Sequence, residues 1–297
     1  MNNDSVVELS KLTKYYGKHR GVIDLDLSVS QGEIFGYLGP NGAGKTTTMR
    51  MLLDFIRPTS GTSKIFGLDI QKNSLELRRR IGYLPTAPSL YGDVTGKQFF
   101  EYCSNLKGGC DWDYVSELIQ RMECDIWRPI DTLSHGNKQK LAIVRALMHR
   151  PELVILDEPT TGLDPLIQNE FESILRETTG EGNTVIFSSH ILSEVEGLCD
   201  RVAIIREGTL VAVEQIADLK AKQVRRIEMS FGNNIRSELF DGIDGIKNII
   251  ITDNKLKCDI VGSLDSLVKV AATQDILDIR TEEPTLEDIF FGYYEGD

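Results

Sequence analysis

The chain has 297 residues with a net charge of −12 at pH 7, 41% hydrophobic and 26% charged residues. This length and balance are those of an ordinary globular protein with room for more than one domain. The acidic sequence pI of about 4.9 disfavours contact with a phosphate backbone, so we expect no nucleic-acid partner. The five cysteines form no CxxC pair, which indicates reduced thiols in a cytosolic protein rather than a disulfide frame or a zinc site.

Neither a secretion signal nor a membrane span is expected. The first nine residues lack a basic and apolar run, and the apolar run 202–205 is closed by charged neighbours on both sides. A spanning helix needs roughly 18 apolar residues. We therefore expect a soluble, cytoplasmic protein, which does not exclude a membrane-bound partner.

Two strands are predicted near the N-terminus, over residues 6–9 and 22–29. Between them lies the segment Lys-Tyr-Tyr-Gly-Lys at 14–18. An aromatic ring such as that of Tyr16 has two possible roles here, because it can stack on a base or pack against the protein. The sequence leaves both open.

A glycine-rich segment follows the apolar run 34–38, which is typical of a buried strand. After it, Met49, Leu52, Leu53 and Ile56 recur at the spacing of one helix face. A glycine-rich turn between a strand and a helix is the setting of a phosphate-binding loop. The predicted loop consists of Gly39, Pro40, Asn41, Gly42, Ala43, Gly44, Lys45, Thr46 and Thr47.

This loop suits an anion for specific reasons. Glycines allow backbone turns that other residues disfavour, and backbone N–H groups at a helix N-terminus attract negative charge. Lys45 is expected to reach the β- and γ-phosphates of a nucleotide, and the Thr46 hydroxyl to bind Mg²⁺.

Residues 86–150 are expected to form a helical subdomain inserted into a mainly parallel sheet. A turn at 58–61, strands at 63–66 and 81–84 and a short basic helix at 75–80 precede it. Beyond Pro85 apolar residues recur at helical spacing and strand signals disappear.

The segment Ser134, His135, Gly136 and Asn137 opens the last helix of this region. Ser134 is either a plain N-cap or, with the bare backbone of Gly136, part of a second anion site. The residues alone do not decide between the two.

The run 153–156 predicts a strand buried on both faces, followed by Asp157 and Glu158. Carboxylates at the end of such a strand lie where α/β sheets bind ligands. We expect Asp157 to hold the Mg²⁺ shell and Glu158 to act as a general base toward water.

Two further polar residues follow in the same part of the chain. Asp164 and Pro165 have the types preferred at the start of a helix. His190 follows the predicted strand 184–188, where it either contacts a γ-phosphate or has a structural role. Strands at 201–206 and 209–213, joined by a turn at 207–208, complete an α/β domain over residues 1–215.

A second domain is expected over residues 216–297. A polar helix at 217–224 leads into strands at 226–231, 246–252, 255–261 and 276–280, with a helix at 264–272 and a hairpin turn at 253–254. This pattern is typical of a small α+β domain and carries no catalytic motif.

The motifs GPNGAGKTT, LSHGN, LVILDEPT, GLD and SSH occur in one order over residues 1–215. In this order they resemble the ATP-binding cassette (ABC) ATPases, and the tail 283–290, EPTLEDIF, is similar to that of the drug-exporter subfamily. The resemblance implies a P-loop NTPase core, Mg²⁺-dependent hydrolysis of ATP, and a position on the cytoplasmic face of the cell membrane beside a separate permease. It also implies a head-to-tail pair of cassettes, either two copies or two different chains.

The resemblance assigns roles to particular residues. It implies adenine stacking by Tyr16, phosphate and Mg²⁺ contacts by Lys45, Thr46 and Asp157, and general-base action by Glu158. In the same family pattern His190 senses the γ-phosphate, Asp164 lies at the dimer interface, and residues 134–137 bind the ATP of the opposite cassette.

Two departures from the family pattern affect these roles. The usual signature is LSGGQ, whereas His135 and Asn137 replace a Gly and the Gln here. Thr86 stands where the family usually has a Gln that contacts Mg²⁺ and the attacking water. These changes predict weakly coupled hydrolysis or asymmetric pairing with a second cassette.

Other classes fit less well. Repair ATPases of this family carry a long coiled coil, translation factors carry two cassettes, and P-loop GTPases carry an NKxD motif; the sequence has none of these. A regulatory subunit that binds ATP and barely hydrolyses it is disfavoured by Lys45, Asp157 and Glu158. The departures at Thr86 and His135 favour it. We expect the permease to dock on residues 85–122, entered through the apolar residues Pro85, Pro88, Leu90 and Tyr91.

Overall fold

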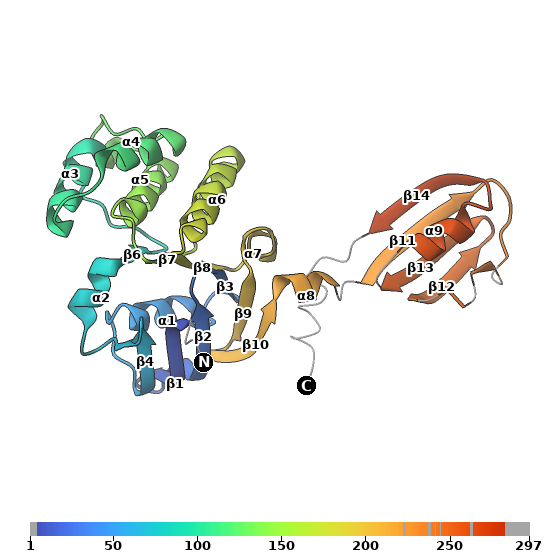
Figure 1. The fold of residues 1–297 in the computed structure, drawn as a ribbon, viewed down its shortest axis with the longest axis horizontal. Coiled ribbons are helices and arrows are strands. Elements are labelled where there is room, and N and C mark those ends of the chain that lie inside the picture. Colours follow the sequence, from blue (N-terminus) through green and yellow to red (C-terminus); the bar gives the residue numbers. More distant parts are fainter. Residues whose placement is uncertain are drawn as a thin grey trace. The chain divides into compact units, whose positions relative to one another are not determined.

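The computed structural model describes residues 5–221, 224–236, 239–240, 242–243, 245–261 and 264–282. Its internal contacts divide the chain into two units, Met1–Glu214 and Gln215–Asp297. Figure 1 shows the elements of both units, each of which is described by itself. Within the described residues, none of the helices has the length and apolar character needed to span a bilayer.

The first unit is built on a six-stranded sheet with the order β10-β9-β3-β8-β7-β6. Strand β3 pairs in parallel with β8 and β9, and β7 pairs in parallel with β6 and β8. Every residue of β3, β7 and β8 is buried, which explains the apolar runs of β3 and β7. The strands are β3 (Ile34–Leu38), β6 (Ile81–Leu84), β7 (Leu153–Asp157), β8 (Thr184–Ser189), β9 (Arg201–Arg206) and β10 (Thr209–Gln215).

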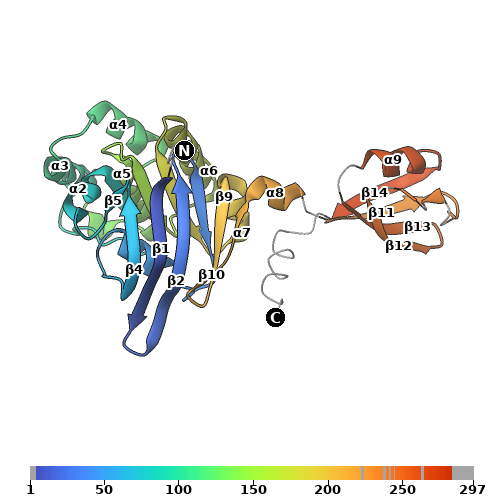
Figure 2. The ribbon, with the colours of Figure 1, turned by 60° about the horizontal axis from the view of Figure 1, so that its bottom comes forward.

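A second, antiparallel sheet lies in the same unit with the order β2-β1-β4-β5; Figure 2 shows β1, β2 and β4 side by side. Its strands are β1 (Ser5–Tyr16), β2 (His19–Ser30), β4 (Ser60–Ile65) and β5 (Leu68–Asp69). The sequence predicted shorter strands and did not separate this sheet. The turn predicted at 58–61 is wrong in its second half, because Ser60 already pairs with Thr13.

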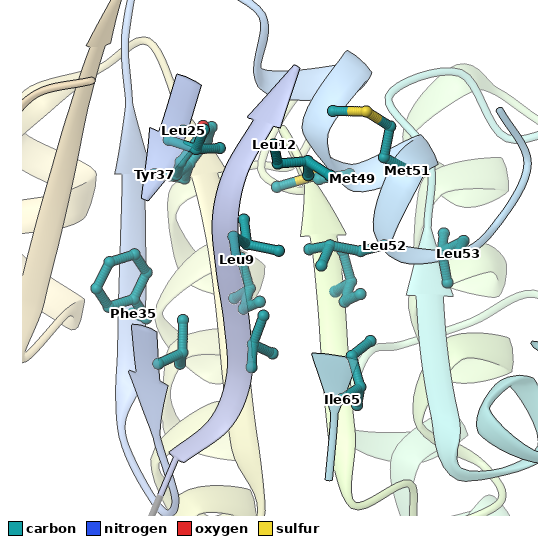
Figure 3. Close-up of a cluster of buried hydrophobic side chains, with 14 of the residues drawn as sticks. Leu9, Leu12, Leu25, Phe35, Tyr37, Met49, Met51, Leu52, Leu53 and Ile65 are labelled. Atoms are coloured by element: carbon teal, nitrogen blue, oxygen red, sulfur yellow. The ribbon is translucent and has the colours of Figure 1, made fainter. Parts of the chain in front are cut away.

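The main core lies between the two sheets and helix α1 (Lys45–Leu52). Leu9, Phe35, Met49 and Ile65 come from four different elements and are almost fully buried (Figure 3). The helix expected to reach Ile56 ends at Leu52, and Asp54 adopts a left-handed backbone with φ 52°.

Residues 86–150 contain mainly helices. Thr95 forms a capping box with Gln98 at the start of α3, and Gly108 ends that helix with φ 86°. The elements here are α3 (Gly96–Lys107), α4 (Trp112–Arg121), the 3₁₀ turn η1 (Ile130–Thr132) and α5 (His135–Leu147), preceded in the chain by α2 (Ser74–Arg80).

Two helices follow β7 and β8. Helix α6 (Pro165–Gly180) begins at the predicted residue, whereas α7 (Leu192–Leu198) was not predicted. Helix α7 has only seven residues, so its apolar positions Leu192, Val195 and Leu198 span less than the window in which a helical period is recognisable.

The second unit contains helix α8 (Ile216–Ala221) and a four-stranded sheet with the order β12-β13-β11-β14. Its strands are β11 (Val224–Phe231), β12 (Ile246–Thr252), β13 (Lys255–Val261) and β14 (Ile276–Glu282), and helix α9 spans Asp265–Ala271. The helix predicted to reach residue 224 ends earlier, since Val224 pairs with Val261 in the sheet. A separate core includes Ile227, Phe240 and Leu267. The tail 283–290 lies outside the described residues.

Candidate functional site

The polar motifs of the sequence follow strands whose carboxyl ends lie along one edge of the six-stranded sheet. Leu38 is level with Ser189, Asp157 with Ser188, and Leu84 with Leu156. Because these strands are parallel, the segments that follow them leave the sheet at the same edge. The glycine-rich loop, the acidic pair, His190 and Thr86 therefore follow the strands at one edge.

The glycine-rich loop connects β3 to α1. Gly42 and Gly44 have φ 81° and 110°, a region that glycine occupies without strain. A side chain at Gly39 would lie 2.4 Å from the Ile205 carbonyl oxygen. Lys45 is the first residue of α1, and its Nζ donates to the carbonyl oxygens of Gly39 at 2.6 Å and Pro40 at 3.2 Å. The helix N-terminus and this ammonium group together favour a phosphate.

Asp157 is fully buried at the end of β7, and both of its carboxylate oxygens accept hydrogen bonds. Thr46 Oγ1 donates to Oδ2 at 2.7 Å, and Ser188 Oγ donates to Oδ1 at 2.8 Å. A hydroxyl and a carboxylate are hard oxygen ligands of the kind that Mg²⁺ prefers. Among the described residues there is no group of three or more His, Cys, Asp or Glu suited to a metal.

Glu158 has a left-handed backbone with φ 52°, a conformation that costs a residue other than glycine of order 1–3 kcal/mol. Its N–H donates to Ser188 Oγ at 3.1 Å. Its Oε1 lies 3.3 Å from Lys45 Nζ and 3.4 Å from His190 Nδ1. With this backbone conformation the Glu158 side chain lies beside Lys45, in the segment after β3, and His190, in the segment after β8.

A further acid, Glu194 of α7, positions the segments after β7 and β8. Its Oε1 accepts from Thr160 Oγ1 at 2.7 Å and its Oε2 from Ser189 Oγ at 2.5 Å. This positioning residue was missed because it lies in the unpredicted helix. The signal that was available is an acid in the first turn of that helix.

Tyr16 ends β1 with 45% of its surface exposed. A side chain placed on Gly21 would lie 3.0 Å from the Tyr16 ring and 3.3 Å from Thr47. The exposed ring is thus beside the last residue of the glycine-rich loop. Lys14 Nζ lies 5.4 Å from the ring centroid.

The segment 134–137 starts α5 and contacts the loop before α6. Ser134 is the N-cap and accepts from Asn137 N at 3.3 Å, while His135 is exposed. A side chain at Gly136 would lie 2.7 Å from the Gly162 carbonyl oxygen. Asp164 caps α6 by accepting from the N–H groups of Leu166 and Ile167, both at 3.1 Å. The two caps therefore belong to adjoining segments.

Comparison with known proteins identifies the family of the chain. The family model described as "ABC transporter" matches residues 22–161. The bacitracin transport ATP-binding protein BcrA of Bacillus licheniformis is 36% identical over 96% of both chains, and the linearmycin resistance ATP-binding protein LnrL of Bacillus subtilis is 30% identical over 96% of this chain and 97% of its own. A solved ATP-binding subunit of an ABC transporter is 29% identical with a TM-score of 0.68, covering 72% of this chain and 92% of that one.

An α/β P-loop nucleotide-binding core with these motifs defines the class of ABC ATPases. This chain belongs to the ABC transporter family, as an ATP-binding, ATP-hydrolysing subunit of the drug-exporter type. The expected fold class is thereby confirmed.

Proposed function

We propose that this chain powers the export of a toxic compound through a separate membrane permease, from the cytoplasmic face of the cell membrane. The observation that carries the proposal is the convergence of Lys45, Asp157, Glu158 and His190 at one sheet edge. Two relatives that align over almost their whole length are named for bacitracin transport and linearmycin resistance. The permease, not this chain, would select the compound.

In the proposed mechanism Lys45 and the loop N–H groups bind the phosphates of ATP, and Tyr16 stacks on the adenine. Thr46 and Asp157 would hold Mg²⁺, which supplies positive charge to the phosphate oxygens. Glu158 accepts a proton from the attacking water. His190, whose Nδ1 lies 3.4 Å from the Glu158 carboxylate, orients that carboxylate toward the γ-phosphate. The hydrogen bonds from Thr46 and Ser188 hold the Asp157 carboxylate in place.

A second cassette completes the proposed site. Ser134, His135, Gly136 and Asn137 would bind the ATP held by the other chain, and Asp164 would lie at the interface. The exposure of Ser134 and His135 at the N-terminus of α5 supports this, because the N-terminus of a helix attracts a phosphate. The partner cassette is a second copy or a different chain.

The permease is proposed to dock on residues 85–122. Tyr91 is 60% exposed and stacks edge-on against Tyr102 with ring centroids 5.5 Å apart. Exposed aromatic side chains of this kind are enriched at interface centres. Leu90, another of the four apolar residues expected at the entry to this surface, is half-buried.

Residues 216–297 are proposed to support dimer formation or regulation, because they carry their own core and no nucleotide motif. Removing them should leave ATP affinity of the monomer nearly unchanged and weaken ATP-driven dimerisation. A large loss of monomer affinity would instead assign them to the nucleotide site.

The experiment that tests the export function is purification of the tagged chain from native membranes in mild detergent. We expect an integral membrane permease to co-purify, and its presence to stimulate ATP hydrolysis. Co-purification of soluble proteins alone, with no permease and no stimulation, would contradict the proposal.

A further inference from the structure

The four-stranded sheet of the second unit has two edge strands, β12 and β14 (Figure 1). An edge strand presents backbone N–H and C=O groups with which a further strand can pair, and proteins protect such edges with bulges and charges. Strand β12 has this protection, because its register with β13 shifts between Lys247 and Ile250, and Asn248 within the shift has φ 54°. Strand β14 pairs with β11 in an unbroken register over residues 278–282. Its outer edge is therefore the one suited to another strand.

The core face of the sheet continues onto β14, where its apolar residues are exposed. Ile279 is level with Met229 of β11, and alternate residues of a strand lie on the same face, so Leu277 shares this face. Met229 is 1% exposed, whereas Ile279 is 46% and Leu277 65% exposed. Among the described residues, the cover of the core face thus decreases from β11 to β14.

The opposite face of the same strand is charged. Asp278 and Arg280 lie on it, and Arg280 Nε donates to Asp278 Oδ2 at 2.9 Å. Arg280 is level with Glu228 of β11, and Glu228 Oε2 lies 3.0 Å from Lys257 Nζ of β13. From β13 to β14 the charges at this level are therefore positive, negative and positive. A strand added at the edge would continue the pattern if it placed an acid beside Arg280.

We propose that β14 pairs antiparallel with the β14 of a second copy of this chain, around a two-fold axis at Ile279, so that the two four-stranded sheets become continuous. Asp278 then lies opposite the partner's Arg280, and Arg280 opposite the partner's Asp278, while the exposed apolar residues of both copies meet on the core face. The proposal rests on the proposed function, in which the second unit supports dimer formation. It names the partner as an identical chain and β14 as the contact.

Charge selects the position of this axis. In an antiparallel pair the residues directly opposite each other project from the same face, and a two-fold axis at one residue places that residue opposite itself. An axis at Asp278 or at Arg280 would bring like charges face to face, which is destabilising. An axis at Ile279 gives one apolar pair and two pairs of opposite charge. The segment Asp278-Ile279-Arg280 is thus complementary to itself in one register.

A direct test is disulfide crosslinking of the full chain with the substitution Ile279→Cys, oxidised without nucleotide. Directly opposite residues have Cα atoms ~4.5–5.5 Å apart, within the range that a disulfide spans. We expect peptide mapping by mass spectrometry to find two copies joined at position 279. Leu277→Cys is the matched control, because it is on the same face and more exposed but lies opposite the partner's Thr281. No link at 279, or an equally fast link at 277, would overturn the inference.

A charge exchange gives a second measurement that does not depend on the crosslink. Asp278→Arg and Arg280→Asp each place like charges opposite one another, so each should weaken self-association without nucleotide at least ~10-fold in analytical ultracentrifugation. An equal mixture of the two variants restores both pairs of opposite charge and should associate as the unaltered chain does. Damage to the fold would not be repaired by mixing. Lys247→Glu, at an exposed residue of the other edge strand, is the control and should have no effect.

The outcomes separate the inference from the proposed function. A mixture that associates no better than the single variants would overturn the pairing. So would an unaltered chain that stays monomeric without nucleotide up to its solubility limit, although export through a permease would still stand. If a chain ending at residue 282 associates and the full chain does not, the edge belongs to residues 283–297 and not to a second copy. If the crosslink at 279 forms but no permease co-purifies from membranes, the inference stands and the proposed function fails.

Discussion

The nucleotide site and an open groove between α3, α5 and β6, which Tyr83, Tyr102, Lys107 and Arg145 line, differ in how their charges are compensated. At the sheet edge Lys45 is 5% exposed and lies 3.3 Å from Glu158, while Asp157 accepts two hydroxyl hydrogen bonds. In the groove Lys107 contacts the Arg78 carbonyl oxygen and the His149 ring, and Arg145 contacts the Tyr83 carbonyl oxygen. None of the described residues that line this hollow of about 370 Å³ is acidic. In the first arrangement the charged groups have partners within one chain, which leaves room only for a small ligand beside them. In the second arrangement no carboxylate lies among the described residues that line the hollow.

The largest effect should come from Glu158. Changing Glu158→Gln removes the proposed proton acceptor and keeps the shape, so hydrolysis should fall about 10²–10⁴-fold while ATP binding remains. Steady-state hydrolysis and nucleotide affinity are measured together. Glu101→Gln, an exposed position on α3, serves as the control. Unchanged turnover in Glu158→Gln would remove Glu158 from the mechanism.

A smaller effect of a different kind is expected at Lys45. Lys45→Ala removes charge-assisted contacts to the phosphates, worth ~1.5–3 kcal/mol, and should weaken ATP binding itself. Because Lys45 also faces Glu158, the double variant Lys45→Ala with Glu158→Gln should lose less affinity than Lys45→Ala alone. Full affinity in Lys45→Ala, measured by calorimetry, would contradict the assignment.

In the groove, the buried His149 predicts that the stability of the folded chain falls at acidic pH. His149 lines the groove, and burial, with the nearby charge of Lys107, lowers its pKa from 6.5 to about 4. Between pH 6.5 and about 4, His149 is therefore protonated in the unfolded chain and neutral in the folded chain. Stability from this group is therefore complete above pH 6.5 and is lost as the pH falls through about 4.

The measurement is the free energy of unfolding between pH 7 and pH 4, compared between the unaltered chain and His149→Gln. The unaltered chain should lose up to about 2–3 kcal/mol more, since each pKa unit corresponds to ~1.4 kcal/mol. His19→Gln, at an exposed residue of β2, is the control. Equal acid sensitivity in all three proteins would show that His149 titrates normally.

The features that were predictable from the sequence are those set by residues close together in the chain. A buried strand followed by glycines, or by Asp157 and Glu158, is a local pattern, and the structure places these residues together because parallel strands end at one edge. The turn of Glu158 toward Lys45 was not predictable, since a left-handed backbone at a glutamate has no signature in residue type. The antiparallel sheet and the groove depend on contacts between distant segments, such as Val7 with Ile65 and Arg145 with Tyr83. The spacing of apolar residues within one segment carries no information about such contacts.

The smallest effect is expected at Thr86, which is exposed two residues beyond β6 and follows the strand that carries Tyr83. The family pattern has a Gln here, whose longer side chain reaches Mg²⁺ and water. Thr86→Gln should raise permease-stimulated hydrolysis by less than ~10-fold, the equivalent of one hydrogen bond of ~0.5–1.5 kcal/mol. Thr86→Asn, with the same amide on a shorter side chain, separates reach from chemistry and should have little effect. If Thr86→Gln also has no effect, and the native complex contains a second, different cassette, the departures at Thr86 and His135 belong to asymmetric pairing rather than to slow hydrolysis.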